Sequence, residues 1–289
     1  MHLIIGLLKN FGTNPFPWWD YDDARIRLIS DSFLSTFGNR NHLAGYMEMA
    51  IPLVLGLLMT GYRGGGLFLL LYLTFIMFTA LALSLSRGGW IGAAIGLSFM
   101  AVALITNRYF KRKVLLTAFI GGALALTFVV LSSTPIVERI RTFEEAENVP
   151  SFQGRVETWG GVIDMIQAHP LIGAGPGTFA TVFTQYVPPG SASRFFYAHN
   201  DYLHFISEVG ISLVGIMIWM IIALYGKGFK KLKDPSRMVR GITLGAMSGI
   251  TAILIHSISD FNLNIPANAL LFTILAALVV SPVPTDNLR

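Results

Sequence analysis

The sequence predicts an all-α polytopic membrane protein, with about seven transmembrane helices and a large, partly helical loop on its outer face. Of the 289 residues, 53% are hydrophobic and only 13% are charged, and the mean hydropathy is +0.61. A soluble domain normally carries about a quarter charged residues. Uncharged apolar stretches long enough to cross a bilayer recur along the chain, and the basic residues gather in alternate connections between them.

Seven apolar stretches of about 17–25 residues are predicted to span the bilayer. They cover residues 42–60, 66–86, 88–106, 114–132, 207–226, 241–258 and 265–281. The apolar run at 3–8 is too short to span, and no basic residue precedes it. We therefore expect it to be the end of a further helix rather than a cleavable signal.

The charged connections assign the two faces of the membrane. Residues 107–113 hold four basic residues and no acid, residues 227–240 hold six basic residues and one acid, and Arg63 follows the first span. By the positive-inside rule these connections are cytoplasmic. The expected organisation is therefore an N-terminal segment with an outer loop, four spans, the large outer loop, three spans and a cytoplasmic tail, at 1–41, 42–132, 133–206, 207–281 and 282–289.

Arg87 stands between two of the predicted spans, in the motif SRGGW (86–90). Residues 66–86 and 91–106 on either side contain no charge. An arginine near the centre of a membrane helix costs roughly 2.5–3.5 kcal/mol on insertion scales, and the two adjacent glycines allow another backbone or a ligand to come close. This pattern predicts a fixed positive charge that holds an anion at the outer face.

The outer loop 133–206 is long enough that a functional role is expected. Apolar residues recur within it at helical spacing and predict an amphipathic helix at 154–168, on the membrane surface or against the spans, ended by Pro170. These residues are Val156, Trp159, Val162, Ile163 and Ile166. The segment GAGPG (173–177) is either a plain turn, which is the commoner case, or a backbone cradle for phosphate oxygens.

Polar residues near the predicted ends of the spans are candidates for chemistry. Asn200 or Asp201 is predicted to cap a helix that runs into the fifth span. His199 would then lie at the mouth of the bundle, where an imidazole can take a proton from a hydroxyl or bond to the loop backbone. His256 and Asp260 are four residues apart and are expected to pair, either structurally or to position His199 or an acceptor.

Three further features have simpler interpretations. The cluster Asp20, Asp22 and Asp23 has oxygen ligands that suit a hard cation, but we expect a solvated loop and no metal site. His204 and Glu208, also four apart, are expected to form a structural pair. The absence of cysteine excludes disulfides and thiolate metal sites.

Four blocks, taken in order and spacing, resemble the O-antigen ligase and O-antigen polymerase superfamily of bacterial envelope glycosyltransferases. The blocks are GNRNHLA (38–44), SRGGWIG (86–92), GR (154–155) with HPLIGAG (169–175), AHNDYL (198–203) and EVG (208–210), and HSISDFNL (256–263) with IPAN (265–268). Relatives usually have several more spans before the first block, whereas only residues 1–8 precede the outer loop here.

The resemblance implies an enzyme that acts on glycans linked to polyprenyl diphosphate. Ligases move the glycan to lipid A–core and polymerases join it to another repeat, and the motifs do not separate the two. The resemblance implies a multi-pass protein of the bacterial inner membrane with a periplasmic active face and a catalytic loop at 133–206. It also implies an inverting reaction without a metal or another cofactor.

The same resemblance suggests roles for individual residues. Arg87 and Arg155 would bind the diphosphate, and His199 would be the catalytic base. Arg40 would add positive charge, or would be an interfacial arginine that extends to the headgroups. The supporting residues would be Asn200, Asp201, His256 and Asp260.

Two functions of other classes remain as alternatives. A transporter of lipid-linked glycans would carry charges at the midplane of several spans, but here Glu48 is the chief exception in nearly charge-free spans. A non-catalytic subunit of an envelope assembly complex is supported mainly by the short N-terminal region. No nucleic-acid partner is needed to explain the basic residues, which predict topology and attraction for anionic lipid.

Overall fold

The computed structural model describes residues 37–107, 110, 150–187 and 195–282, and the regular structure in these ranges is helical. The long helices are α3 (Arg40–Leu58), α4 (Gly64–Leu83), α5 (Arg87–Thr106), α8 (Pro150–Ala168), α11 (Ser212–Lys231), α12 (Arg237–His256) and α13 (Pro266–Val280). Shorter elements are α9 (Phe179–Val182), the 3₁₀ turn η3 (Phe183–Gln185), α10 (Asp201–Val209) and the 3₁₀ turn η4 (Asn262–Asn264).

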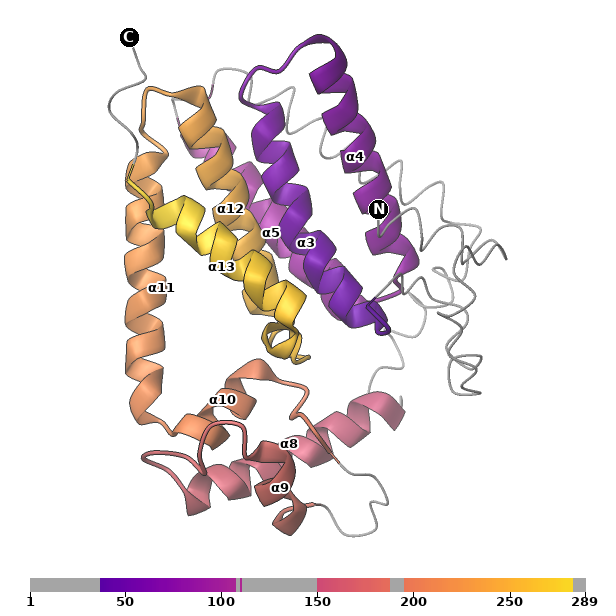
Figure 1. The fold of residues 1–289 in the computed structure, drawn as a ribbon, viewed down its shortest axis with the longest axis vertical. Helices are drawn as coiled ribbons and strands as arrows, with labels where there is room; N and C mark the ends of the chain where they lie inside the picture. Colours follow the sequence, from indigo (N-terminus) through magenta and orange to yellow (C-terminus); the bar gives the residue numbers. More distant parts are fainter. Residues whose placement is uncertain (1–36, 108–109, 111–149, 188–194, 283–289) are drawn as a thin grey trace.

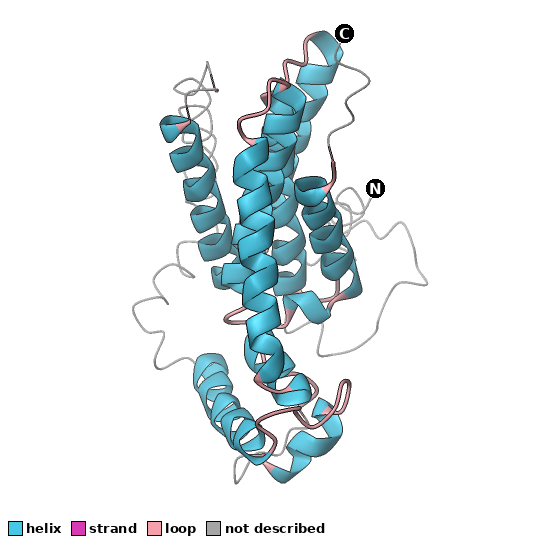
Figure 2. Ribbon diagram, turned by 90° about the vertical axis from the view of Figure 1, so that its left-hand side faces the viewer, coloured by secondary structure: helices cyan, strands magenta, loops and turns pink. Residues whose placement is uncertain are grey.

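The helices form a lengthwise bundle with a smaller helical unit at one end. In Figure 1, α3, α4, α5, α11, α12 and α13 run along the long axis, and α8, α9 and α10 lie below them. The view turned by 90° in Figure 2 shows the same separation. The smaller unit, residues 150–210, corresponds to much of the predicted outer loop and is called the end unit below.

Four of the described helices are long and apolar enough to cross a membrane, namely α4, α5, α11 and α12. The structure therefore supports a multi-pass membrane protein, but it does not confirm the predicted count of about seven spans. Helix α3 matches the first predicted span, and α13 is a shorter apolar helix at the seventh. The predicted span at 114–132 lies outside the described residues.

The predicted fifth span at 207–226 begins too early. Helix α10 ends at Val209, Gly210 has φ +78°, and α11 starts only at Ser212. A side chain at Gly210 would also collide with the backbone of Leu171. The chain therefore turns sharply between α10 and α11, and α10 belongs to the end unit rather than to the span.

A row of glycines allows α12 to pack at backbone distance in the centre of the bundle. A Cβ atom on Gly245 would lie 2.5 Å from the carbonyl oxygen of Pro52, and one on Gly249 would lie 2.6 Å from that of Met49, both in α3. On the other side, a Cβ atom on Gly96 of α5 would lie 2.6 Å from the Ser248 carbonyl oxygen. Small residues at such spacing are typical of helix contacts in membranes.

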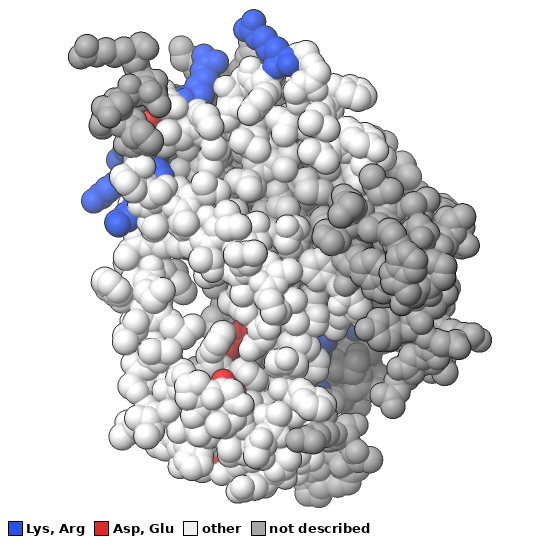
Figure 3. Space-filling view, viewed as in Figure 1, with Lys and Arg blue, Asp and Glu red and all other residues white. Residues whose placement is uncertain are grey.

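The outer helices expose apolar side chains, as expected of surfaces that face lipid. Examples are Phe68 and Phe75 on α4 and Trp219 and Ile222 on α11. The visible Lys and Arg side chains lie mostly at the end that carries the α11–α12 connection, as Figure 3 shows. The segment 227–240 covers the end of α11, this connection and the start of α12, and it contains six basic residues.

The amphipathic helix predicted at 154–168 is confirmed as α8, which ends at Ala168 just before Pro170. Its buried side contributes Val162 and Met165 to a small core with Phe179 and Phe183. Val156 and Ile163, which were grouped with the apolar stripe, are exposed instead. The end unit therefore has a core of its own, which packs α8 against α9 and η3.

Candidate functional site

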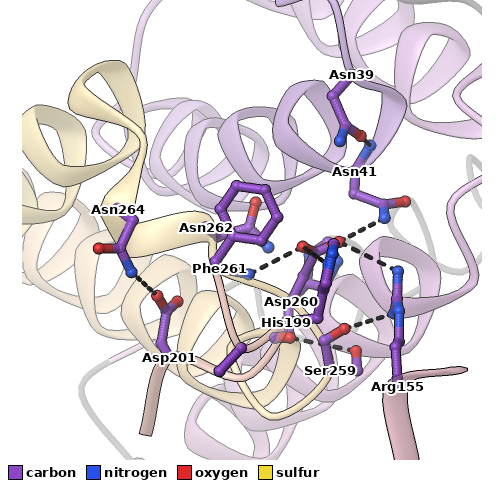
Figure 4. A network of polar contacts seen from close by, with 12 residues as sticks. Asn39, Asn41, Arg155, His199, Asp201, Ser259, Asp260, Phe261, Asn262 and Asn264 are labelled. Atoms are coloured by element: carbon purple, nitrogen blue, oxygen red, sulfur yellow. Dashed lines mark hydrogen bonds and ion pairs between the residues drawn. The ribbon is translucent and has the colours of Figure 1, made fainter. Parts of the chain in front are cut away.

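Asp260 is the centre of a polar network at the end of the bundle (Figure 4). It lies in the turn between α12 and α13, and its side chain is only 1% exposed. Arg155 Nη2 of α8 is 3.7 Å from Asp260 Oδ2, and His199 Nδ1 is 3.5 Å from Asp260 Oδ1. The side-chain amide of Asn41 in α3 donates a hydrogen bond to the same carboxylate. Three segments distant in the sequence thus meet at one carboxylate.

The charges around Asp260 keep it ionised despite its burial. Burial alone would raise the pKa of the carboxyl group, but the contact with His199 and the charge of Arg155 outweigh this effect. The pKa of Asp260 therefore lies well below its usual range. The backbone N–H of Phe261 also donates to Asp260 Oδ1 at 2.9 Å. The network thus contains a fixed negative charge that orients the basic groups beside it.

Arg87 and Arg155, both predicted to bind diphosphate, lie close enough to Arg40 for their charges to act on it. Burial and the positive charges of Arg87 and Arg155 lower the pKa of Arg40, which is the first residue of α3, and Asp260 has the opposite effect. Arg155 is further held by a 2.5 Å hydrogen bond from Nη1 to the Ser259 carbonyl oxygen. The end of the bundle therefore holds more positive than negative charge around Asp260.

Arg87 is the first residue of α5, directly after the helix cap. The hydroxyl of Ser86 accepts a hydrogen bond from the Gly89 N–H at 3.2 Å. The indole N–H of Trp90 donates to the Leu81 carbonyl oxygen at 3.1 Å and ties this helix start to the end of α4. The SRGGW motif thus builds a rigid helix start that places Arg87 at the site end.

His199 has an unusual backbone and a partly exposed ring. Its φ of +51° lies in the left-handed region, which a non-glycine residue rarely adopts. The side chain is 36% exposed, and the ring meets that of Phe261 edge-on at 4.9 Å between centroids. Because Nδ1 faces Asp260, Nε2 is the ring nitrogen that points away from this carboxylate.

Asn200 and Asp201 have different roles, although either was predicted as the cap. Asn200 caps α10, because its side-chain oxygen accepts the Leu203 N–H at 3.0 Å. Asp201 instead accepts the Leu263 N–H at 2.9 Å and the Asn264 side-chain amide at 2.8 Å. Burial raises the pKa of Asp201 to about 6. This residue therefore fastens the α12–α13 connection, residues 257–265, to the end unit.

The expected pairing of His256 with Asp260 on one helix face is wrong. Helix α12 ends at His256, so Asp260 lies in the following turn. His256 Nδ1 is instead 3.1 Å from Glu48 Oε1 of α3, and both side chains are buried. The i, i+4 spacing predicted a shared face because it assumed that the helix continues to Asp260.

The glycine turn at 173–177 is a plain turn, as the simpler interpretation held. The N–H of Ala174 donates to the Ser207 carbonyl oxygen, and that of Gly175 to the Glu208 carbonyl oxygen, both at 2.9 Å. These N–H groups are engaged within the protein, so the idea of a phosphate cradle is wrong.

The predicted pair of His204 and Glu208 is formed, with His204 Nε2 at 3.7 Å from Glu208 Oε1.

Glu208 also accepts the Phe179 N–H, which supports a structural role for the His204–Glu208 pair. No group of three or more His, Cys, Asp or Glu that suits a metal ion occurs among the described residues. The cluster at Asp20 to Asp23 lies outside them, so the expectation of no metal site there stays a prediction.

Asn41 and Ser259 are contributors to the network that the sequence does not predict, and Glu48 has a partner that it does not predict. Asn41 and Ser259 lie inside the resemblance blocks, but an amide and a carbonyl oxygen carry no titratable group to draw attention. Glu48 had a signal, because it is an acid in an otherwise apolar stretch. Its partner His256 is 208 positions away, too far for any local pattern to predict.

A family model described as O-antigen ligase matches residues 72–220. The matched segment is about half of the chain and includes Arg87, Arg155 and His199, whereas Arg40 and Asp260 lie on either side of it. No curated protein matches the chain.

Proposed function

The chain belongs to the O-antigen ligase family, and from this premise we propose that it transfers a glycan from polyprenyl diphosphate to lipid A–core or a related acceptor. Family membership supports an enzyme of ligase or polymerase type in a multi-pass membrane protein. One observation carries the proposal of this particular reaction. Arg155 and His199 both contact Asp260, and the charges of Arg87, Arg155 and Asp260 all act on Arg40.

The arginines suit the leaving group of this reaction. As the bond between the anomeric carbon and the phosphate oxygen breaks, its electron pair moves onto the diphosphate. Guanidinium groups stay charged and match phosphate oxygens in pairs. In a partly dry site they stabilise the developing charge more than they would in water. Arg87 and Arg155 would contact the diphosphate, and Arg40 would add to the positive field.

His199 and Asp260 suit the attacking group. The ionised Asp260 favours a proton on Nδ1 of His199, which leaves the lone pair of Nε2 for the acceptor hydroxyl. Nε2 takes the hydroxyl proton while the acceptor oxygen bonds to the anomeric carbon and the diphosphate leaves. A single displacement of this kind inverts the anomeric centre. The 3.5 Å between Nδ1 and Asp260 is long for a hydrogen bond, and such contacts often tighten in the substrate complex.

The acceptor decides between ligase and polymerase. The donor chemistry and all the residues named above serve either reaction. The basic α11–α12 connection supports a cytoplasmic location for that end and a periplasmic location for the site, in the bacterial inner membrane. We propose the ligase reaction first and the polymerase reaction as the alternative. Cells with an inactive variant distinguish the two, because unmodified core indicates a ligase and core with one repeat indicates a polymerase.

The test is a transfer assay with the purified protein, a polyprenyl-diphosphate glycan and candidate acceptors. His199→Ala and Arg87→Ala should each reduce transfer by at least about 10²-fold, with normal protein level and membrane insertion. The matched control is Arg63→Ala, since Arg63 is exposed before α4 at the other end of the bundle. Full transfer by either of the first two variants would reject the assigned role.

The same assay tests the expectation that the reaction needs no metal. EDTA should leave the transfer rate unchanged, because arginine side chains provide the positive charge near the diphosphate. Loss of activity that a divalent ion restores would contradict this expectation. The carboxylates at Asp20 to Asp23 would then be the first candidates for ligands.

A further inference from the structure

Glu48 and His256 form a buried pair that the proposed reaction does not use. Glu48 lies two turns into α3, and His256 is the last residue of α12. Both side chains are nearly inaccessible, and Glu48 Oε1 is 3.1 Å from His256 Nδ1. An ionisable pair inside a bundle of apolar helices is costly and is usually kept for a function. The question is therefore what this pair holds in place.

The imidazole of His256 occupies the space beside the start of α5. A Cβ atom on Gly88 would lie 2.6 Å from His256 Cδ2, 2.7 Å from its Nε2 and 3.0 Å from Ser259 Oγ. The ring thus fills the space that a side chain at position 88, directly after Arg87, would need. Four residues further on, a Cβ atom on Gly92 would lie 2.6 Å from Glu48 Oε2. Both glycines give the pair room on one face of α5.

The backbone of His256 is joined to the turn that carries Asp260. The Ser259 N–H donates to the His256 carbonyl oxygen at 2.9 Å, and the Ser259 carbonyl oxygen accepts Arg155. Asp260 is the next residue. His256 therefore lies between the helix start with Arg87 and the turn where Arg155 and His199 meet. Glu48 joins this arrangement to α3, the helix of Arg40 and Asn41.

We propose that Glu48 is a positioning residue for the arginine cluster. By accepting the Nδ1–H of His256, it holds the imidazole as a spacer between the start of α5 and the turn 257–260. The spacer sets the position of Arg87 relative to Arg155 and Asp260. It therefore sets the distance between the two guanidinium groups that would bind a diphosphate. This inference rests on the proposed function, because it assigns the spacing to the binding of the donor diphosphate.

Two substitutions of similar size separate positioning from simple packing. Glu48→Gln keeps an oxygen that accepts the His256 N–H, whereas Glu48→Leu removes it and stays apolar. We expect Glu48→Leu to weaken the binding of polyprenyl diphosphate by about tenfold and to slow transfer by about 10–100-fold. Glu48→Gln should keep near-normal values. A common loss in both variants, or no loss in either, would overturn the proposal.

Gly88→Ala provides a second test if Glu48→Leu does not fold. It pushes on the imidazole without changing Glu48 and should weaken polyprenyl-diphosphate binding to a similar extent. Gly160→Ala is the matched control, because a Cβ atom there meets nothing within 4 Å. Normal binding by Gly88→Ala, with the control also normal, would contradict the spacer role of the ring.

A distance measurement tests the inference without any substrate. The chain has no cysteine, so spin labels can be placed at Ile91→Cys on α5 and Ile258→Cys in the turn, both of which are exposed. The distance between the labels should shift or broaden in Glu48→Leu and stay sharp in Glu48→Gln. An unchanged distance between the labels in Glu48→Leu would contradict the positioning role of Glu48. Diphosphate binding that is unchanged in Arg87→Ala would instead reject the proposed function.

Discussion

At the scale of single residues, Asp260 and Asp201 show opposite solutions to the burial of a carboxylate. Both are 1% exposed and lie near the same turn. Asp260 is surrounded by His199 and Arg155, and its pKa is held below the usual range. Asp201 accepts hydrogen bonds from Leu263 and Asn264, and burial still raises its pKa to about 6. Asp260 therefore provides a negative charge, whereas Asp201 holds the α12–α13 connection through hydrogen bonds.

Asp260→Asn should reduce transfer by about 10²–10⁴-fold, because His199 loses the carboxylate that favours a proton on Nδ1.

The Asp260→Asn variant should also lose stability. The pKa of Asp260 is depressed in the fold, so its contribution is present above the unfolded value near 3.8 and is lost as pH falls below it. Melting temperatures of wild type and variant should thus differ at neutral pH and converge in acid. Equal melting curves at neutral pH would contradict this.

Asp201→Asn should have the opposite pH signature. The folded protein holds a proton on Asp201 more tightly than the unfolded chain, because the pKa rises from 3.8 to about 6. Wild-type stability should therefore decline as pH rises between these values, by roughly 2–3 kcal/mol for a shift of this size. The amide is neutral throughout, so the variant should lack this decline. A pH series of thermal unfolding curves measures the difference, and parallel curves would rule it out.

At the scale of elements, backbone contact between α3, α5 and α12 depends on glycine. Gly245→Ala should destabilise the bundle by about 1–3 kcal/mol, because the added methyl group meets the Pro52 carbonyl oxygen and the Leu53 backbone. The matched control is Gly215→Ala in α11, where a Cβ atom meets nothing within 4 Å. The control should gain helix stability by up to about 1 kcal/mol. Thermal unfolding in detergent compares the two, and equal effects would argue against the packing explanation.

Apolar runs predicted the positions of α3, α4, α5, α12 and α13 because each of these helices needs only a long, predominantly apolar stretch. They failed between α10 and α11, where hydropathy does not change at Gly210 and the break comes from contact with Leu171. The exposure of Val156 and Ile163 on α8 was missed for a similar reason. Periodicity shows that one side is apolar, but it does not show which of the apolar residues reach the small core with Phe179.

The sequence named several residues of the candidate site, but it did not predict most of their partners. Arg87, Arg155 and His199 were proposed because they lie in blocks that resemble a family, and Arg87 also stood out as a charge between apolar runs. The contact of Asn41 with Asp260 joins positions 219 residues apart. Such contacts depend on how the helices are arranged in space, and no local spacing carries that information. The fold had to be known before Asp260 could be recognised as the centre.

At the scale of the whole molecule, the Asp260 network and the basic segment 227–240 lie at opposite ends of the bundle. Helices α3, α5 and α13 begin at the end that carries Asp260, and α12 ends there (Figure 1). The segment 227–240, which contains six basic residues at the end of α11, in the connection and at the start of α12, lies at the other end (Figure 1). By the positive-inside rule we expect the arginine cluster to lie on the outer face. That orientation suits a glycan donor that is used outside the cytoplasm.

Single cysteines test this orientation, because the chain has none of its own. Gln167→Cys lies exposed on α8 in the end unit, and Lys230→Cys lies exposed near the end of α11. An impermeant maleimide added to intact spheroplasts should label the first at once and the second only after the membrane is opened. A label on Arg87→Cys should follow the first pattern, since α5 starts beside the Asp260 turn through Gly88. If Gln167→Cys and Arg87→Cys became accessible from opposite sides, the arginines and the imidazole could not act on one diphosphate, and the proposed reaction would be rejected.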